Sequence, residues 1–211
     1  MRTILLARHG ATPWTAEGRY QGQASVPLSD RGREAVRALA RRLSACATAR
    51  VDTVVTSDLA RAVESARILV EGTGLEPALD PRLRERDCGR WTGLTAAEVR
   101  ARFPVDVAAL EAGGDVARGG GESFADVRAR TLAWLADLVG SGPGTSLVVT
   151  HDGPIRALLG ALDGGGRVEG PTQPLASVRV VRLDGSGAAA SIGEPVWGED
   201  GAEPDTWVPP L

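Results

Sequence analysis

Two residues capable of nucleophilic and acid–base chemistry occur in matching places along the chain. His9 and His151 are the only histidines, each follows a short apolar run, and each is followed within two residues by a glycine. In open α/β sheets, ligands bind outside the carboxyl ends of the strands, so this placement predicts that both imidazoles face one site. The alternative is that each histidine only holds the backbone of its own loop.

Two arginines accompany the histidines. Arg8 directly precedes the first of them, and Arg61 lies in the sequence S-D-L-A-R-A of residues 57–62, one turn into a predicted helix. A planar guanidinium binds two phosphate oxygens at once, so this combination indicates a phosphate site. The alternative pairs Arg61 with Asp58 or Glu64 on a solvated helix face. As an exposed helical residue, Arg61 is expected to contribute little to folding stability.

A carboxylate suited to proton transfer follows further along the chain. Glu85 lies in the sequence L-R-E-R-D-C-G-R-W-T-G of residues 83–93, after a short strand predicted near residues 77–80. Beside a phosphate ester, a carboxyl group can protonate the leaving oxygen. The alternative is a surface charge among the neighbouring arginines, which are Arg82, Arg84, Arg86 and Arg90.

A metal site is a second chemistry that these residues allow. His9, His151, Glu85 and Asp152 together form a ligand set for a divalent cation. Two arginines facing the same point would repel such a cation, so we expect neither a metal nor a cofactor. The chain contains no lysine, which excludes a lysine Schiff base and the lysine of a phosphate-binding P-loop.

The apolar pattern predicts strands that alternate with helices. We expect strands at residues 3–7, 52–56, 77–80, 146–150 and 177–183. We expect one helix that starts near Ser29 and four more over residues 58–70, 95–102, 123–139 and 154–162. This alternation predicts an α/β three-layer sandwich with a mostly parallel central sheet flanked by helices.

Length and composition favour a single domain over residues 1–211. Residues 94–121 contain Pro104 and several glycines and look like a short insertion over the predicted active site, and residues 194–211 form an acidic tail rich in proline and glycine. The net charge is −3, and no apolar run reaches the ~18 residues that a membrane span needs. We therefore expect a cytoplasmic protein that binds neither nucleic acid nor membrane.

Several short motifs stand in a recognisable order. They are R-H-G-A-T-P-W at residues 8–14, Q-G at 21–22, P-L-S-D-R-G at 27–32, S-D-L-A-R-A at 57–62, L-R-E with G-R-W-T-G within 83–93, G-E-S at 121–123 and T-H-D-G-P-I-R at 150–156. In this order and at these spacings, the chain resembles the histidine phosphatase superfamily, also called phosphoglycerate mutase-like. The resemblance covers nearly the whole chain.

The resemblance implies a phosphoric monoester hydrolase that works through a phosphohistidine. It implies that His9 is the nucleophile and Glu85 the general acid. It also implies three phosphate ligands, namely Arg8, Arg61 and His151. Neighbouring arginines disfavour a protonated His9, and a bound phosphate dianion favours the protonated form of Glu85. Water then attacks the phosphoenzyme with Glu85 as the base.

Further contacts to the substrate are implied at Thr12, Thr15, Gln21, Gly22 and Asp152. Two of these residues depart from the family's usual pattern. Thr15 stands where asparagine is common, and Asp152 stands where glycine is usual. An extra carboxylate beside a phosphate site weakens anion binding unless it is turned away or paired.

Two related activities compete with a phosphatase. A mutase of this family carries a longer and more basic insertion than residues 94–121, which favours phosphatase for this chain. A catalytically weak member that only binds phosphate esters is expected to have lost one of the central charged or imidazole residues, and none is lost here.

The identity of the substrate depends on weaker signals. Trp91 and Phe103, together with few fixed charges in the insertion, favour a small phosphate ester whose alcohol part is partly apolar or uncharged. Packing in a core explains both aromatic residues equally well. The sequence leaves a homodimer open, since it shows no heptad repeat and no obvious apolar edge.

Overall fold

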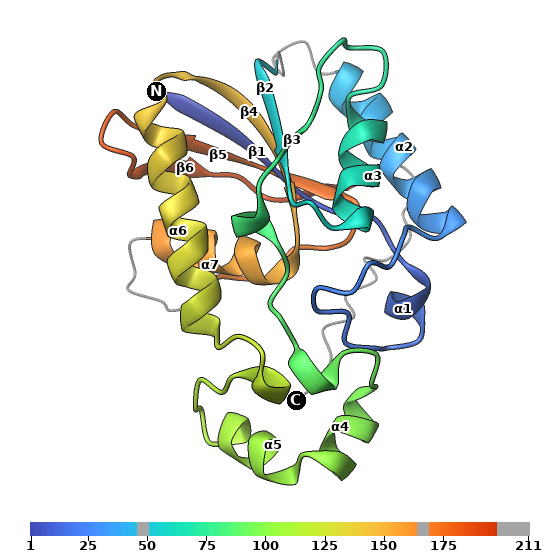
Figure 1. Ribbon diagram of the computed structural model, residues 1–211. Coiled ribbons are helices and arrows are strands. Elements are labelled where there is room, and N and C mark those ends of the chain that lie inside the picture. The colour runs from blue at the N-terminus through green and yellow to red at the C-terminus, as the bar shows by residue number, and fades with distance from the viewer. Residues whose placement is uncertain (46–50, 164–168, 198–211) are drawn as a thin grey trace.

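A central sheet forms the middle of the molecule, with helices on both of its faces (Figure 1). The computed structural model describes residues 1–45, 51–163 and 169–197. The strands are β1 (Arg2–Arg8), β2 (Thr53–Thr56), β3 (Ala78–Leu79), β4 (Gly144–Thr150), β5 (Ser177–Leu183), β6 (Ala189–Ile192) and β7 (Val196–Trp197). The predicted three-layer α/β architecture is confirmed.

The order of the strands places β1 inside the sheet. That order is β3-β2-β4-β1-β5-β6, with β7 also paired to β5. Each neighbouring pair from β3 to β1 in this order is parallel, whereas β5 is antiparallel to β1. The amide of Ala176, just before β5, donates to the carbonyl of His9 at 3.0 Å, so β5 starts at the end where β1 finishes. The sheet is therefore parallel as predicted up to β1 and reverses direction at β5.

Helices cover the two faces of the sheet in pairs. Their bounds are α1 (Pro13–Ala16), α2 (Asp30–Ala45), α3 (Ala60–Leu69), α4 (Ala96–Arg102), α5 (Pro104–Glu111), α6 (Phe124–Gly140) and α7 (Asp152–Leu162). Helices α2 and α3 pack together on one face, and α6 and α7 pack together on the other (Figure 1). In the described part of the chain, no helix combines the length and the apolar character needed to cross a bilayer.

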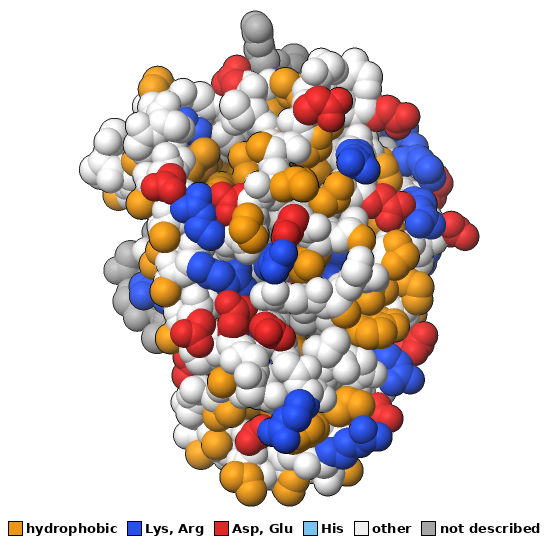
Figure 2. All heavy atoms as spheres, viewed as in Figure 1, with side chains coloured by type: hydrophobic (Ala, Val, Ile, Leu, Met, Phe, Trp, Pro, Cys, Tyr) orange, Lys and Arg blue, Asp and Glu red, His pale blue; other side chains and the backbone are white. Residues whose placement is uncertain are grey.

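The apolar run at the start of the chain is explained by burial on both faces of β1. Leu5 shares a core with Leu39 of α2, whereas Leu6 shares a core with Trp134 of α6. Successive side chains of a strand point to opposite faces, so a strand covered on both sides is apolar throughout. On the molecular surface, acidic and basic side chains are interspersed over the face drawn in Figure 2, as expected for a small net charge.

Capping boxes begin α1, α4 and α6, and they satisfy backbone N–H groups that lack partners in the first turn. Glu98 accepts from the amide of Thr95 at 2.8 Å while Thr95 accepts from the amide of Glu98, which confirms the predicted start of α4. Ser123 and Asp126 form the same arrangement at α6. Helix α7 begins at Asp152, two residues earlier than predicted, and the amide of Gly153 in its first turn donates to Glu85.

The insertion folds into a small helical layer at one end of the molecule (Figure 1). Helix α5 was not predicted, because Pro104 reads as a loop signal; here the proline occupies the first turn, where its missing N–H removes no hydrogen bond. Trp91 is fully buried, and its ring centroid lies 6.2 Å from that of Phe103. Both aromatic side chains therefore build the core of this layer, which also contains Tyr20, Cys88, Val99 and Val107.

A close approach of two backbone segments joins the insertion to the rest of the domain. Gly119 has a φ of 58°, in the left-handed region that favours glycine. A Cβ atom at this position would lie 2.6 Å from the carbonyl oxygen of Cys88 and 2.7 Å from the amide nitrogen of Arg90. Only glycine allows the two segments to touch in this way.

We expect Gly119→Ala to lower the free energy of unfolding by about 3 kcal/mol, because the left-handed backbone and the contact with backbone atoms are both unfavourable. Gly120→Ala is the matched control, since Gly120 also has a positive φ but has no atom within 4 Å of its Cβ position. The control should lose only about 1 kcal/mol. Urea unfolding measures both values, and equal losses would mean that the close approach carries no energy.

Candidate active site

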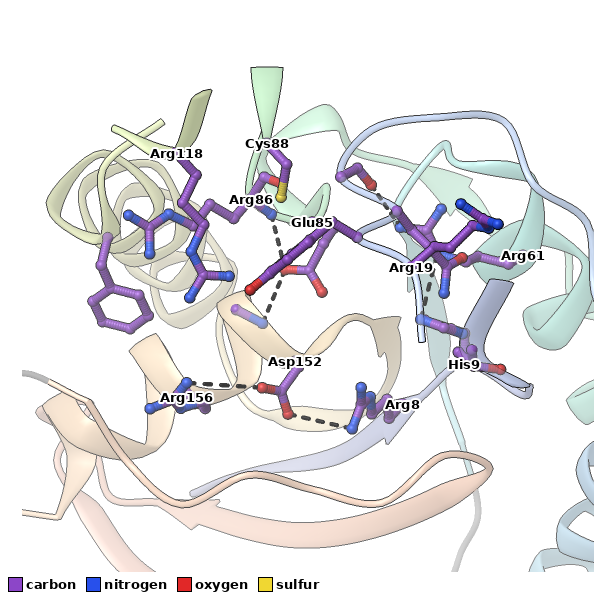
Figure 3. Close-up of a pocket in the computed structure, with 16 residues that line it drawn as sticks. Arg8, His9, Arg19, Arg61, Glu85, Arg86, Cys88, Arg118, Asp152 and Arg156 are labelled. Carbon is purple, nitrogen blue, oxygen red and sulfur yellow. Dashed lines mark hydrogen bonds and ion pairs between the residues drawn. The ribbon is translucent and has the colours of Figure 1, made fainter. Parts of the chain in front are cut away.

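A pocket lies at the carboxyl ends of the parallel strands (Figure 3). Strands β1 and β4 are neighbours, and His9 and His151 follow directly after them. The amide of His9 donates to the carbonyl of Thr150 at 3.1 Å, which ties the two strand ends together. The structure thus brings the two histidines together as predicted. Six arginines line the pocket, namely Arg8, Arg19, Arg61, Arg86, Arg118 and Arg156.

The hydrogen bonds of His9 determine which ring nitrogen carries the proton. Its Nδ1 lies 2.7 Å from the carbonyl oxygen of Gly10, and a carbonyl can only accept, so Nδ1 bears the hydrogen. Nε2 is then unprotonated, and it accepts from Nε of Arg61 at 3.3 Å. Burial, followed by the charges of Arg61 and Arg8, holds the pKa of His9 well below its usual value. His9 is therefore a neutral imidazole with a lone pair on the pocket side of the ring.

Arg61 is buried, which corrects the expectation of an exposed helical arginine. Its side chain donates to the carbonyls of Gly22 at 2.8 Å and Ala24 at 3.0 Å, besides its contact with the imidazole. The alternative partners are engaged elsewhere, Asp58 with Arg84 and Glu64 with Arg33. Burial lowers the pKa of Arg61 to about 10. This value is still far enough above neutral pH for the guanidinium to remain charged. Its place beside His9 follows from the loop that supplies the two carbonyls.

His151 lies behind the pocket wall and has no exposed surface. Its ring centroid is 5.0 Å from that of His9. Burial, with the charge of Arg61, lowers its pKa well below the usual value. Neither ring nitrogen has a hydrogen-bond partner among the residues that the structure describes. Buried polar atoms are nearly always paired, so these two nitrogens are an exception. His151 is not among the residues that line the pocket, and its predicted contact with phosphate stays a prediction.

Glu85 lies in the middle of the pocket, between the two groups of labelled arginines (Figure 3). Its Oε1 accepts from the amide of Gly153, in the first turn of α7, at 3.0 Å and from the amide of Arg86 at 2.8 Å. Its backbone carbonyl accepts from Arg130 at 3.1 Å and from Gln23 at 3.2 Å. Glu85 is thus held in the site by backbone and side-chain bonds, and the alternative of a loose surface charge is wrong.

Asp152 is paired rather than turned away. One carboxylate oxygen lies 3.4 Å from Arg8, and the other lies 4.0 Å from Arg156 (Figure 3). Arg8 also donates to the carbonyl of Gln173 at 2.6 Å. This pairing offsets the repulsion that an extra carboxylate exerts on an anion. Over the described ranges, no group of three or more His, Cys, Asp or Glu side chains is arranged to hold a metal ion.

The remaining predicted contacts fall in different places. Thr12 is buried and does not line the pocket, because its hydroxyl caps α1 by accepting from the amide of Thr15 at 3.2 Å. Thr15 lines the pocket, but its hydroxyl donates to the carbonyl of Thr12 at 2.7 Å, so its donor is already used. Gln21 and Gly22 both line the pocket, and the carbonyl of Gly22 holds Arg61.

The two aromatic residues on which the expected alcohol site rested do not line the pocket, and several arginines do. Trp91 and Phe103 are not among the lining residues, whereas Arg86, Arg118 and Arg156 are. Two of these arginines had a signal in the sequence: Arg86 directly follows Glu85, and Arg156 lies one turn along α7 from Asp152. Arg118 had none, since nothing in the glycine-rich segment indicates which way it folds.

Comparison with known proteins agrees with the geometry. Residues 4–192 match the sequence profile of the histidine phosphatase superfamily (branch 1). The chain is 38% identical over 170 residues to glucosyl-3-phosphoglycerate phosphatase of Mycobacterium tuberculosis, covering 76% of this chain and 75% of the relative. It is 34% identical over 166 residues to phosphoserine phosphatase 1 of Hydrogenobacter thermophilus, covering 78% of this chain and 77% of that one.

The fold comparison leads to the same group. A solved structure of mycobacterial glucosyl-3-phosphoglycerate phosphatase with VO3 matches this chain with a TM-score of 0.81 at 33% identity, covering 95% of this chain and 100% of the other. The sequence match spans most of the chain, and relatives named as phosphatases share its fold and about a third of its residues. The chain therefore belongs to the histidine phosphatase superfamily and is a phosphoric monoester hydrolase.

Proposed function

We propose that this phosphatase hydrolyses a small phosphorylated metabolite without a metal ion, through a phosphohistidine formed on His9. The state of His9 carries the proposal. Its Nδ1–H is held by the Gly10 carbonyl, its unprotonated Nε2 keeps a lone pair that accepts from Arg61, and its pKa is lowered by burial and by the neighbouring arginines. A neutral imidazole fixed in this tautomer is ready to act as a nucleophile at neutral pH.

In the first step, Nε2 of His9 attacks the phosphorus atom, and the bond from phosphorus to the ester oxygen breaks. The leaving oxygen takes a proton from Glu85. Both hydrogen bonds to the Glu85 carboxylate end on Oε1, so Oε2 is the oxygen available for this transfer. Arg8 and Arg61 balance the charge of the transferring phosphoryl group, which is the main requirement of phosphoryl transfer.

In the second step, water attacks the phosphorus atom of the phosphohistidine. Glu85, now ionised, accepts the proton of the water, and the bond from phosphorus to Nε2 breaks. Phosphate leaves, and both His9 and Glu85 return to their starting states. We assign His151 a supporting contact with the phosphoryl oxygens, since its ring lies 5.0 Å from that of His9 and its nitrogens have no partner among the described residues.

Metal chelation is expected to leave the activity intact, because Arg8 and Arg61 already supply the positive charge that a metal would bring. Hydrolysis of p-nitrophenyl phosphate after exhaustive dialysis against EDTA measures this. Loss of activity on chelation and its recovery with a divalent ion would contradict metal independence.

Arg61→Ala is expected to weaken binding of vanadate or phosphate and to lower the free energy of unfolding by about 2 kcal/mol or more, because the carbonyls of Gly22 and Ala24 lose their partner. Arg37→Ala is the control, since Arg37 is half exposed on α2 and its ion pair spans 3.8 Å. Vanadate inhibition and urea unfolding report the two effects. Unchanged vanadate affinity with lower stability would make Arg61 a structural residue only.

The division of labour between His9 and Glu85 gives the sharpest test of the mechanism. His9→Ala should lose nearly all turnover and form no phosphoenzyme. Glu85→Gln keeps an oxygen for the two amides that bind Oε1 but cannot donate a proton. It should slow hydrolysis of an alkyl ester such as glycerol 3-phosphate by about 10²-fold or more, while still forming phosphoenzyme from p-nitrophenyl phosphate, whose leaving group needs little protonation.

Acid-labile, base-stable phosphate on the Glu85→Gln protein, and its absence from His9→Ala, would support both roles. Glu111→Gln is the control for a lost carboxylate, because Glu111 is exposed on α5 and lies outside the pocket. Equal losses on aryl and alkyl esters would reduce Glu85 to a residue that orders the site. A fully active His9→Ala protein would overturn the proposed intermediate.

A further inference from the structure

The peptide unit that follows Glu85 takes part in holding the Glu85 carboxylate. Its N–H belongs to Arg86 and donates to Oε1 of Glu85 at 2.8 Å. Its C=O belongs to Glu85 and accepts from Nη2 of Arg130 at 3.1 Å. Because a peptide unit is planar and trans, its N–H and its C=O point in opposite directions. The bond from Arg130 therefore fixes the direction in which the N–H meets the carboxylate.

Arg130, on α6, is itself held by a carboxylate. Its Nε and Nη2 donate to the two carboxylate oxygens of Glu122 at 2.7 and 2.9 Å. Its Nη1 donates to the carbonyl of Arg82, three residues before Glu85, at 2.7 Å. The two side chains of the pair are only 17% and 21% exposed, so water competes little for these bonds. A pair with two parallel hydrogen bonds fixes the plane of the guanidinium.

Glu122 contacts the same segment on the other side of Glu85. Its Oε2 accepts from the amide of Asp87 at 2.8 Å, and its own amide donates to the carbonyl of Asp87 at 3.0 Å. Its carbonyl accepts from Nε of Arg86 at 2.9 Å. The ion pair between Glu122 and Arg130 thus binds the backbone before, at and after the residue that carries the reactive carboxyl group.

Neither member of the pair is placed to touch the substrate. Among the residues that the structure describes, Glu85 and Arg86 line the pocket, whereas Glu122 and Arg130 do not. Gln23 also donates to the carbonyl of Glu85, at 3.2 Å, but a neutral donor forms a weaker bond than a guanidinium does. The pair can therefore act on the reaction through the segment that it holds, or through the charge of Arg130 at a distance.

We propose that Glu122 and Arg130 are positioning residues for proton transfer, because they orient the peptide unit that engages Oε1 of Glu85 and leaves Oε2 for the ester oxygen. This inference rests on the proposed function, which makes Glu85 the general acid. In Figure 3, both bonds to the Glu85 carboxylate end on one oxygen, one from the amide of Arg86 and one from that of Gly153. A misplacement of about 1 Å in a reacting group is enough to slow catalysis strongly.

Two substrates with different leaving groups reveal how well the acid is positioned. The alkoxide of glycerol 3-phosphate needs a proton as it leaves, whereas p-nitrophenolate needs little protonation. The value of kcat/KM reports on the steps up to the departure of the leaving group, so it is independent of the later hydrolysis of the phosphoenzyme. The ratio of kcat/KM for the two esters therefore measures proton transfer to the ester oxygen.

Glu122→Gln should lower kcat/KM for glycerol 3-phosphate about tenfold more than for p-nitrophenyl phosphate. The amide of the new side chain has one acceptor oxygen and one NH2 group, so it cannot accept from both Arg130 and Asp87 as the carboxylate does. The peptide unit after Glu85 then loses its fixed direction. Steady-state rates with both esters measure the change in the ratio.

Glu64→Gln is the matched control. The carboxylate of Glu64 accepts from Nε of Arg33 at 2.6 Å and from the amide of Leu28 at 3.0 Å, which are the same kinds of partner that Glu122 has. Among the described residues, Glu64 is not part of the pocket lining. We expect Glu64→Gln to lose stability in urea unfolding while it keeps the ratio of the two esters. A changed ratio in Glu122→Gln alone is then not a consequence of lower stability.

Arg130→Lys separates geometry from charge. It keeps the positive charge but replaces the planar fork by one nitrogen, which cannot serve the carboxylate of Glu122 and the carbonyls of Arg82 and Glu85 together. We expect the same selective loss on glycerol 3-phosphate. An unchanged ratio in Arg130→Lys would mean that the charge acts at a distance, and it would overturn the positioning role.

A double variant tests whether the pair acts through Glu85. In a protein that already carries Glu85→Gln, the acid is absent, so adding Glu122→Gln should change the ratio no further. A further selective loss on glycerol 3-phosphate in the double variant would show that the pair acts through another group, and it would overturn the inference.

Failure of this inference is distinguishable from failure of the proposed function. If Glu85→Gln separates the two esters but Glu122→Gln lowers both equally, the pair is only structural, while the proposed mechanism stands. If Glu85→Gln itself does not separate the esters, the proposed general acid is wrong, and the positioning role fails with it.

Discussion

The burial of Arg61 against His9 is the interaction on which the rest of the site depends. A guanidinium removed from water keeps its charge only where hydrogen bonds satisfy it, and the carbonyls of Gly22 and Ala24 do so here. The loop after α1 therefore passes the start of α3, where its two carbonyls hold Arg61 beside His9. Burial, together with the charges of Arg61 and Arg8, lowers the pKa of His9, and the two arginines leave an excess of positive charge that an anion balances.

Two carboxylates share the pocket, and their surroundings suit them to different tasks. Asp152 lies against the guanidinium of Arg8 and holds that arginine in place. Glu85 has no ion pair with the described residues and is held by two backbone amides on one oxygen. The second oxygen of Glu85 has no such partner, which agrees with the role in proton transfer proposed for this residue.

The sequence was informative where chemistry and strand ends coincide. Both histidines were placed correctly because parallel neighbouring strands bring their carboxyl ends together, and the apolar run of β1 marked a strand covered on both faces. The sequence was uninformative where a contact depends on a loop. Arg61 is buried because the carbonyls of Gly22 and Ala24 accept its hydrogen bonds, and no sequence pattern predicts that contact. The direction of β5 depends on its long-range antiparallel pairing with β1, and the position of Arg118 depends on how glycines pack.

The position of β1 inside the sheet has a consequence for how the molecule is made. Its partners on either side are β4 and β5, which lie far along the chain, and the carbonyl that fixes Arg8 belongs to Gln173. Contacts this distant in sequence require large loops to close, which slows folding. On the ribosome, β1 emerges with both of its edges unpaired, and they stay unpaired until β4 and β5 have been synthesised. The nucleophile that follows β1 is therefore made long before the strands that complete its site.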